Sequence, residues 1–376
     1  APDRLLTLRH AGVGTGDPWL PEGAVATVGN NVDAFFQALS APAGVHPIDL
    51  FASWSPQFQA ARGDFRATVT GPGLFDHAYQ VAIAPQDFVQ RPGAPAQPVP
   101  SGSPQLNAKI VQAFYAGNWL HDLFHDLGFD EAAGNAQMDN YGRGGIAGDP
   151  LQIHAGFSTT FAFAPPDGTA PALTLGRNEF SLSNRDVSGF DFGVFAHEWA
   201  HTMFVRLTTM GPRGQQGALN EGTADFIGVF LMLQPEHRQA APGTGDFHGA
   251  YPIGAYMNLD YDFPLDDRPP AGSPGQPDNT YYHGIRRFPY SASMALNPLT
   301  FGHISPDNPL PPGSQPFDWK LRSLNPAEIH TAGEVWASAL WQCARNIMAA
   351  APPRQFGLRQ RQVLADLVAA LKLFPT

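Results

Sequence analysis

The sequence is poor in cysteine, in basic side chains and in long apolar runs. Its single cysteine, Cys343, excludes a disulfide within the chain. This leaves the redox compartment open, because some exported bacterial proteins also lack disulfides. No apolar run reaches the roughly 18 residues that a membrane-spanning helix needs, so we expect no such helix.

Basic residues are outnumbered, with 22 Lys and Arg against 33 Asp and Glu, which gives a net charge of −11. A chain of this charge repels phosphate backbones and anionic membrane surfaces, so we expect neither nucleic acid nor a membrane as a partner. Apolar residues, in contrast, make up 43% of the chain and can form a sizeable core. A length of 376 residues exceeds what one core usually serves, which favours two lobes.

The first hundred residues have the texture of strands and turns. Short apolar runs at 24–28, 65–69 and 79–83 are separated by Gly, Pro and Asp, so we expect a β-rich N-terminal region. Residues 91–104 concentrate Pro, Gly, Ser and Ala without periodicity, which predicts an extended connection.

Apolar residues at helical spacing predict helices at about 107–128, 190–207, 220–234, 329–350 and 355–373. The second half is therefore expected to be mainly helical, apart from a long irregular region at 236–325 that is rich in Pro, Gly and Asp. The glycine-rich segment 134–150 matches neither a dinucleotide fingerprint nor a Walker motif, so we interpret it as a structural loop.

A metal-binding pattern lies on the predicted helix 190–207. The residues from His197 to His201 match H-E-x-x-H, which places two imidazoles one turn apart on one helix face. A catalytic zinc site needs a third protein ligand and leaves its fourth position for water. Glu221, separated from His201 by nineteen residues and carried by the next predicted helix, supplies that ligand. The alternative is two ordinary helix histidines whose spacing arises by chance.

Three further residues complete the predicted chemistry. Glu198 lies on the H-E-x-x-H helix without being a ligand, so it is the expected general base toward a zinc-bound water. Asp225, four residues after Glu221, is placed to accept the outer N–H of a ligand histidine. His330 is the expected donor to the oxyanion that forms on the substrate carbonyl. The alternatives are a solvated carboxylate, a surface acid and a packing histidine, respectively.

Two other groups resemble metal sites less well. His121 and His125 are also one turn apart, but no glutamate lies between them and Gly145 stands where a third ligand would follow, so we interpret them as helix-face or packing histidines. The four aspartates within 260–267 offer oxygen ligands for calcium, against the alternative of a solvated loop.

These motifs belong to longer segments that resemble the fungalysin family of extracellular metalloproteases, whose catalytic lobes look like thermolysin. The resemblance extends across most of the chain. It includes LPEGAVATVGNNVDAFF (20–36), GDFRATVTGPGLFDHAY (63–79), NWLHDLFHDLGFDEAAGNAQMDNYGRGGIAGDP (118–150), APPDG (164–168), FAHEWAH (195–201), NEGTADF (220–226), GIRRFPYS (284–291), NPLT (297–300) and HTAGEVWASALW (330–341).

The resemblance implies an α+β, two-lobed thermolysin-like zincin with its active-site cleft between the lobes. A β-rich lobe of residues 1–206 would end in the H-E-x-x-H helix, and a mainly helical lobe of residues 207–376 would carry the third ligand. It implies zinc at His197, His201 and Glu221 and the roles given above for Glu198, Asp225 and His330. It also implies secretion and an inhibitory propeptide in the precursor. The chain begins Ala1-Pro2, without a leader, and we interpret it as the mature enzyme.

The same resemblance suggests how polypeptide substrates are held. Arg286 looks like the arginine that grips the substrate carbonyl beyond the cut. Phe161 and Ala162 lie in the segment that resembles the substrate-pairing edge strand, although residues 158–163 replace the usual Asn-Ala-Asn element. Thr202 stands where the family commonly has Gly. Neither departure removes a catalytic group.

Two rival functions remain. A non-catalytic module with structural zinc would normally close the metal with four protein ligands, often cysteines. A zinc aminopeptidase resembles this pattern but has one residue fewer between the second histidine and the third ligand, so the spacing favours an endopeptidase.

Overall fold

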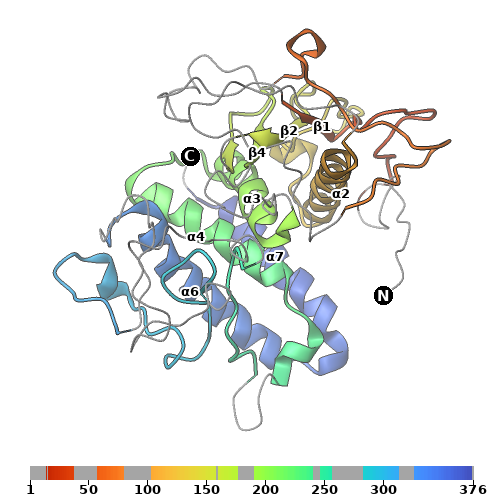
Figure 1. Cartoon of the computed structure of the whole chain (residues 1–376). Helices are drawn as coiled ribbons and strands as arrows, with labels where there is room; N and C mark the ends of the chain where they lie inside the picture. Colours follow the sequence, from red (N-terminus) through yellow and green to blue (C-terminus); the bar gives the residue numbers. More distant parts are fainter. Residues whose placement is uncertain are drawn as a thin grey trace. The chain divides into compact units, whose positions relative to one another are not determined.

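The computed structural model describes residues 14, 16–37, 57–79, 103–157, 160–176, 190–239, 246–255, 283–312 and 326–374. The chain divides into two compact units, residues 1–190 and 191–376 (Figure 1). The expected connection is described only from Ser103, and the aspartates of 260–267 lie outside the described residues. The fold is mixed, with a four-stranded sheet and five α-helices in the described parts.

The first unit is built around a small sheet with strand order β1-β2-β4-β3. Strands β1 (Val32–Phe36), β2 (Leu151–Phe157) and β4 (Ala172–Gly176) run parallel, and β3 (Phe161–Phe163) pairs antiparallel with β4. All five residues of β1 are buried, as expected for a parallel strand that is covered on both faces.

The predicted apolar runs at 24–28 and 65–69 lie beside each other. Thr27 N donates to the carbonyl of Ala67 at 3.2 Å, and Val69 N donates to that of Val25 at 3.1 Å. Most of the third run, 79–83, lies outside the described residues.

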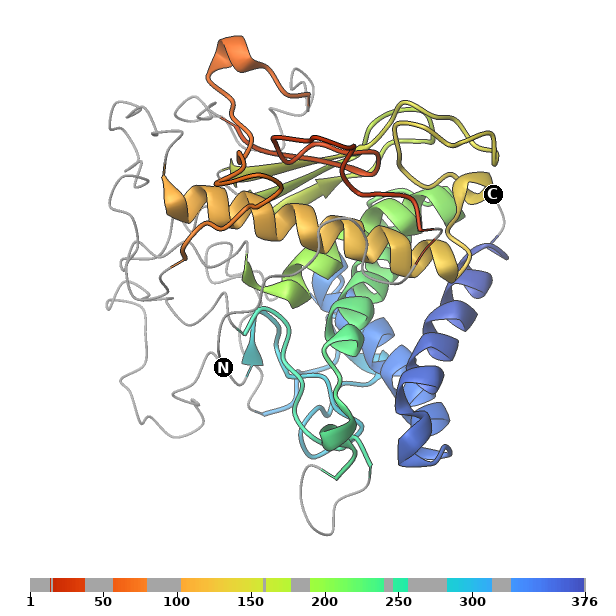
Figure 2. The ribbon, with the colours of Figure 1, turned by 90° about the vertical axis from the view of Figure 1, so that its right-hand side faces the viewer.

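Helix α2 (Pro104–Asp126) lies along the sheet, as Figure 2 shows. Ser103 caps its start through a hydrogen bond from Leu106 N, and Pro104 occupies the first turn, where a missing N–H costs little. Gly117 permits the close approach to the sheet: a Cβ there would lie 2.8 Å from Cδ1 of Ile153. The predicted helix is confirmed, and it ends shortly before Gly128, whose φ is 103°.

The glycine-rich segment is a loop, as predicted, and Glu131 holds it. The carboxylate of Glu131 accepts from Arg143 Nε at 2.7 Å and from Gln137 Nε2 at 3.0 Å, and its Oε2 lies 3.0 Å from His125 Nε2. Burial alone would raise the pKa of Glu131, but these partners lower it to about 2.

The second unit is mainly helical in its described parts, as expected from the sequence. Its long helices are α3 (Phe192–Thr208), α4 (Gly214–Leu231), α6 (Ile329–Ala349) and α7 (Phe356–Leu371). Short 3₁₀ segments lie at 235–239, 301–304 and 353–355. None of the helices in the described ranges has the length and hydropathy of a transmembrane span.

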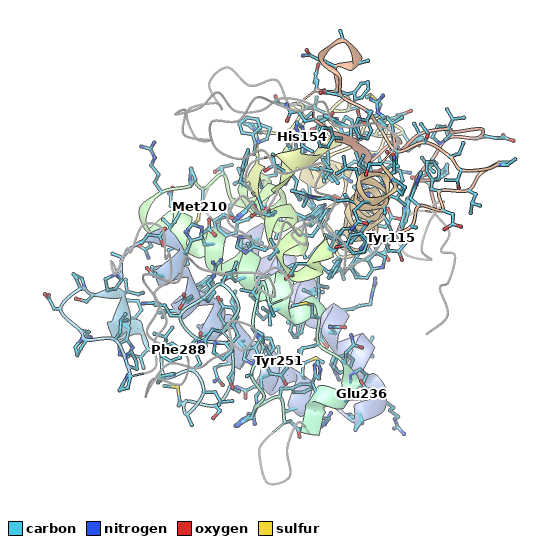
Figure 3. The ribbon with its side chains drawn as sticks, in the orientation of Figure 1. Tyr115, His154, Met210, Glu236, Tyr251 and Phe288 are labelled. Atoms are coloured by element: carbon cyan, nitrogen blue, oxygen red, sulfur yellow. The ribbon has the colours of Figure 1, made fainter. Side chains whose placement is uncertain are left out.

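The lobe boundary predicted after residue 206 stays a prediction, and the boundary between the two compact units, at 190/191, places α3 with the helical unit. The physical reason is the close packing of α3 on α4: a Cβ at Gly228 would lie 2.4 Å from the carbonyl oxygen of Gly193. The core of this unit also contains Trp341, whose ring centroid lies 4.7 Å from that of Tyr251, labelled in Figure 3.

Candidate metal centre

Helix α3 carries the H-E-x-x-H residues in a buried setting. Asp191 starts the helix by accepting a hydrogen bond from Val194 N at 3.1 Å. His197 and His201, one turn later, are 6% and 9% exposed, and their Nε2 atoms lie 3.1 Å apart. Two imidazole nitrogens therefore converge on one point.

Helix α4 brings Glu221 to the same point. Its Oε2 lies 3.3 Å from His197 Nε2, and its Oε1 lies 3.8 Å from His201 Nε2. Within the part of the chain that the structure describes, these three side chains form the only group of at least three His, Cys, Asp or Glu able to share a metal ion.

The residues present fit a zinc ion. Glu221 Oε2 is buried and makes no hydrogen bond of good geometry, although His197 Nε2 lies 3.3 Å away, as expected for an oxygen that serves as a ligand. Two imidazoles and one carboxylate are also the donor set of a catalytic zinc site. The predicted ligand group is therefore brought together by the fold.

Each histidine of the candidate ligand group faces an oxygen atom from α4. His197 Nδ1 lies 2.7 Å from Asp225 Oδ1, where Asp225 was predicted to act. His201 Nδ1 lies 2.8 Å from Asn220 Oδ1. An oxygen facing each Nδ1 fixes the N–H there and turns the Nε2 lone pair toward the metal position.

Asn220 was missed in the sequence. It could have been found from its position directly before Glu221 on a predicted helix. Asn220 is buried, and a buried amide needs hydrogen-bond partners.

Asp225 is held from two further directions. Arg286, itself buried, donates from Nε to Oδ2 at 2.6 Å and from a terminal nitrogen to Oδ1 at 2.7 Å, and the Tyr290 hydroxyl also donates to Oδ2. Burial alone would raise the pKa of Asp225, but Arg286 and His197 hold that pKa well below its ordinary value. Arg286 is thus bound to Asp225, and its contact with substrate stays a prediction.

The charges around the candidate ligands favour the binding of a positively charged group. Burial disfavours the charged form of His197, but Asp225 and Glu221 outweigh burial and raise its pKa to about 10. Burial alone would raise the pKa of Glu221, whereas His330 and the ligand histidines hold it well below its ordinary value. A ligand imidazole must be neutral, so a metal ion that binds here displaces protons.

Glu198 lies beside the ligand group. It is 8% exposed, and its Oε2 is 3.9 Å from His201 Nε2. Burial raises the pKa of Glu198 above its ordinary value, against the lowering effect of His197. A carboxyl group with a raised pKa is suited to take and return a proton.

His330 lies in the first turn of α6 and faces Glu221. Its Nε2 is 3.4 Å from Glu221 Oε2, and its Nδ1 is 2.8 Å from Glu328 Oε1. Burial lowers the pKa of His330, but Glu221 and Glu328 outweigh burial and raise it.

Glu328 is the cap of α6, and the sequence interpretation missed it. Its carboxylate accepts from the backbone N–H of His330 at 2.9 Å and of Thr331 at 3.2 Å. An acidic residue just before the expected helix start was the available signal.

Three further predicted residues lie on β3 and α3. Phe161 and Ala162 lie on β3, an edge strand of the sheet in the first unit, while Ser158 and Thr159 lie outside the described residues. Thr202 is buried in α3.

The histidine pair on α2 has hydrogen-bonding partners. His125 pairs with Glu131, and His121 Nε2 lies 3.1 Å from Gln137 Oε1. These bonds fit the interpretation as packing histidines.

Comparisons with known proteins place the chain among metallopeptidases. A model of the family described as fungalysin metallopeptidase matches residues 24–262 and 273–360. An extracellular metalloproteinase MEP of Leptosphaeria maculans is 30% identical over 253 residues, which cover 64% of this chain and 32% of that protein. One from Neosartorya fischeri is 31% identical, covering 66% of this chain and 34% of that protein. One from Aspergillus flavus is 32% identical, covering 65% and 32%. The alignments thus span about a third of the length of these relatives.

Proposed function

This chain belongs to the fungalysin metallopeptidase family, and on that premise we propose that it is a secreted zinc endopeptidase that hydrolyses peptide bonds within proteins. The observation that carries the proposal is the convergence of His197, His201 and Glu221, whose ligand atoms all lie within 4.8 Å of one another. Two imidazoles and a carboxylate leave a fourth zinc position for water, as catalytic sites do.

Each residue near the ligands then has a task. When bound, zinc lowers the pKa of a coordinated water toward about 7 and polarises the substrate carbonyl. Glu198 accepts a proton from the water while the oxygen of the water bonds to the carbonyl carbon of the substrate. Glu198 then passes the proton to the leaving amine as the C–N bond breaks.

His330 donates from Nε2 to the carbonyl oxygen as negative charge develops on it. The contact of 2.8 Å between its Nδ1 and Glu328 supports this role, because Glu328 holds the ring in place and keeps its charged form favourable. Asp225 and Asn220 keep the ligand imidazoles in the tautomer that faces the metal.

The proposal extends to substrate and location. Arg286 is proposed to reach the substrate carbonyl beyond the cut, and β3, with Phe161 and Ala162, to pair with an extended polypeptide. The relatives are named extracellular metalloproteinases, and these names support the proposal that the chain is secreted. The thermolysin-like arrangement of lobes 1–206 and 207–376 and a propeptide that inhibits the precursor are proposed from family membership.

The rival of a structural zinc module is less well supported. Structural zinc is usually closed by four protein ligands, whereas in the described residues three ligands converge and a buried carboxyl group, Glu198, stands beside them. The aminopeptidase rival is disfavoured by the spacing between His201 and Glu221.

Chelation tests the proposal. The purified chain should cleave unfolded casein at internal bonds, lose this activity together with its zinc after treatment with a chelator, and regain it when zinc is added back. Cleavage that persists in metal-free protein, or release of single N-terminal residues only, would contradict it.

A further inference from the structure

Two consecutive arginines bind two different helices. Arg286 binds Asp225 on α4, the residue that orients the ligand His197. Arg287 instead donates from Nε to Glu334 Oε2 at 3.0 Å, and its backbone N–H donates to Glu334 Oε1 at 3.1 Å. Phe288, the next residue, marks this loop in Figure 3.

Arg287 also reaches the start of α6. One of its terminal nitrogens donates to the backbone carbonyl of Thr331, the residue after His330. Through Thr331 and Glu334, Arg287 thus holds two successive turns of α6, and the first of them carries His330.

This ion pair is fully enclosed. Arg287 is 2% exposed and Glu334 is 1% exposed, and the other terminal nitrogen of Arg287 is buried without a hydrogen-bond partner. A buried ion pair with incomplete hydrogen bonding adds little net stability, because desolvation offsets the attraction between the charges. Its clearest effect is therefore on geometry.

The same turn of α6 touches α4 next to the metal ligand. A Cβ added to Gly222 would lie 2.3 Å from the carbonyl oxygen of Gly333, and one added to Gly333 would lie 3.0 Å from Cβ of Glu221. The contact between Gly222 and Gly333 sets how closely α6 approaches Glu221. Arg287, in the loop at 283–290, holds the same turns of α6 in place.

We propose that Arg287 is a positioning residue for His330: by holding the Thr331 carbonyl and Glu334, it keeps His330 Nε2 at its place 3.4 Å from the carboxylate of Glu221. The inference rests on the proposed role of His330 as the donor to the developing oxyanion. A displacement of about 1 Å at such a donor costs on the order of a hundredfold in rate.

A double-mutant cycle tests this inference on the zinc-loaded full chain. Arg287→Met should lower kcat for a fluorogenic peptide by about ten- to a hundredfold, with KM and zinc content close to the parent values. His330→Ala should lower kcat by about a hundred- to a thousandfold. Because Arg287 acts through His330, adding Arg287→Met to His330→Ala should lower kcat no further.

Glu334→Gln is the second arm, and it decides the question if Arg287→Met does not fold. It keeps the side-chain shape and one acceptor oxygen but weakens the hold of Arg287. We expect a kcat loss of several-fold to tenfold in the parent and none in the His330→Ala background.

Arg238→Met is the matched control, because Arg238 binds the opposite end of α6. It donates to the carbonyls of Ala349 and Ala351 and pairs with Asp246 at 2.9 Å. The control should lower the melting temperature and leave kcat of the folded enzyme unchanged.

Two outcomes contradict the inference and differ from each other. If His330→Ala is slow and the Arg287 or Glu334 variant multiplies that loss by the factor seen in the parent, the inference falls and the proposed function stands. If His330→Ala retains the parent kcat, the proposed role of His330 falls, and the inference with it.

Discussion

Nδ1 of His197 lies 2.7 Å from Oδ1 of Asp225, and this contact joins the candidate metal ligands to the buried interior of the helical unit. Asp225 in turn is held by both Arg286 and Tyr290. The orientation of a candidate ligand on α3 therefore depends on residues from α4 and from the loop at 283–290.

Asp225→Asn should weaken zinc binding by about ten- to a hundredfold, because the neutral amide no longer matches both the N–H of His197 and the guanidinium of Arg286. Competition with a zinc indicator measures the change in Kd. Asp246→Asn, which disturbs the pair with Arg238, is the control and should bind zinc as the parent does. Equal Kd values for both variants would contradict the role of Asp225.

Glu198→Gln should retain zinc and lose turnover. The amide preserves the shape of the side chain but cannot accept the proton, a step that contributes about 10²–10⁴-fold. Zinc content and casein cleavage are measured on the same preparation. Cleavage near the parent rate in a variant with full zinc would assign the proton transfer to another group.

Glu131 predicts how stability depends on pH. Its pKa in the folded chain is about 2, below the ordinary 4.5, so its contribution is fully present above about pH 5 and is lost as the pH falls toward 2. The difference in unfolding free energy between the parent and Glu131→Gln should therefore be largest near neutral pH and shrink in acid.

Denaturant titrations at several pH values measure that difference. Glu236→Gln, at an exposed glutamate labelled in Figure 3, is the control for the loss of a surface carboxylate. If the difference in unfolding free energy between the parent and Glu131→Gln stays constant between pH 6 and about pH 3, the proposed stabilisation of the ionised Glu131 by its hydrogen-bond partners is contradicted.

Glycine at 222 is required by the contact between α4 and α6. Gly222→Ala should destabilise the helical unit by about 1–3 kcal/mol, because its Cβ would lie 2.3 Å from the carbonyl oxygen of Gly333. Gly357→Ala on α7, where a Cβ meets nothing within 4 Å, should instead stabilise the chain by about 0.4–1 kcal/mol. The melting temperatures of the two variants are compared with that of the parent. Shifts of the same sign in both variants would contradict this packing.

The sequence predicted those features that local patterns encode. The five long helices follow apolar periodicity, and the ligand group follows the H-E-x-x-H spacing together with Glu221. The start of α4 was predicted at about 220, but the helix begins at Gly214. Glycines at 214 and 217 weaken the local signal, whereas Gly217 allows close packing on Pro212 and Ile329, and this packing overrides propensity.

Partners that come from distant segments were not predictable in the same way. Arg287 and Glu334 are 47 positions apart, and Tyr290 and Asp225 are 65 apart. No local periodicity encodes such pairs, because they form only when the loop at 283–290 packs on α4 and α6. The register of β1 against β2 is likewise set by tertiary packing.

The zinc content of Glu221→Ala compared with that of Glu198→Gln tests the central claim most directly. The account predicts about one zinc per chain in the parent and in Glu198→Gln, and little zinc in Glu221→Ala at the same free zinc concentration, since two remaining histidines bind zinc poorly. Stoichiometric zinc in Glu221→Ala would contradict the assignment of His197, His201 and Glu221 as the metal centre.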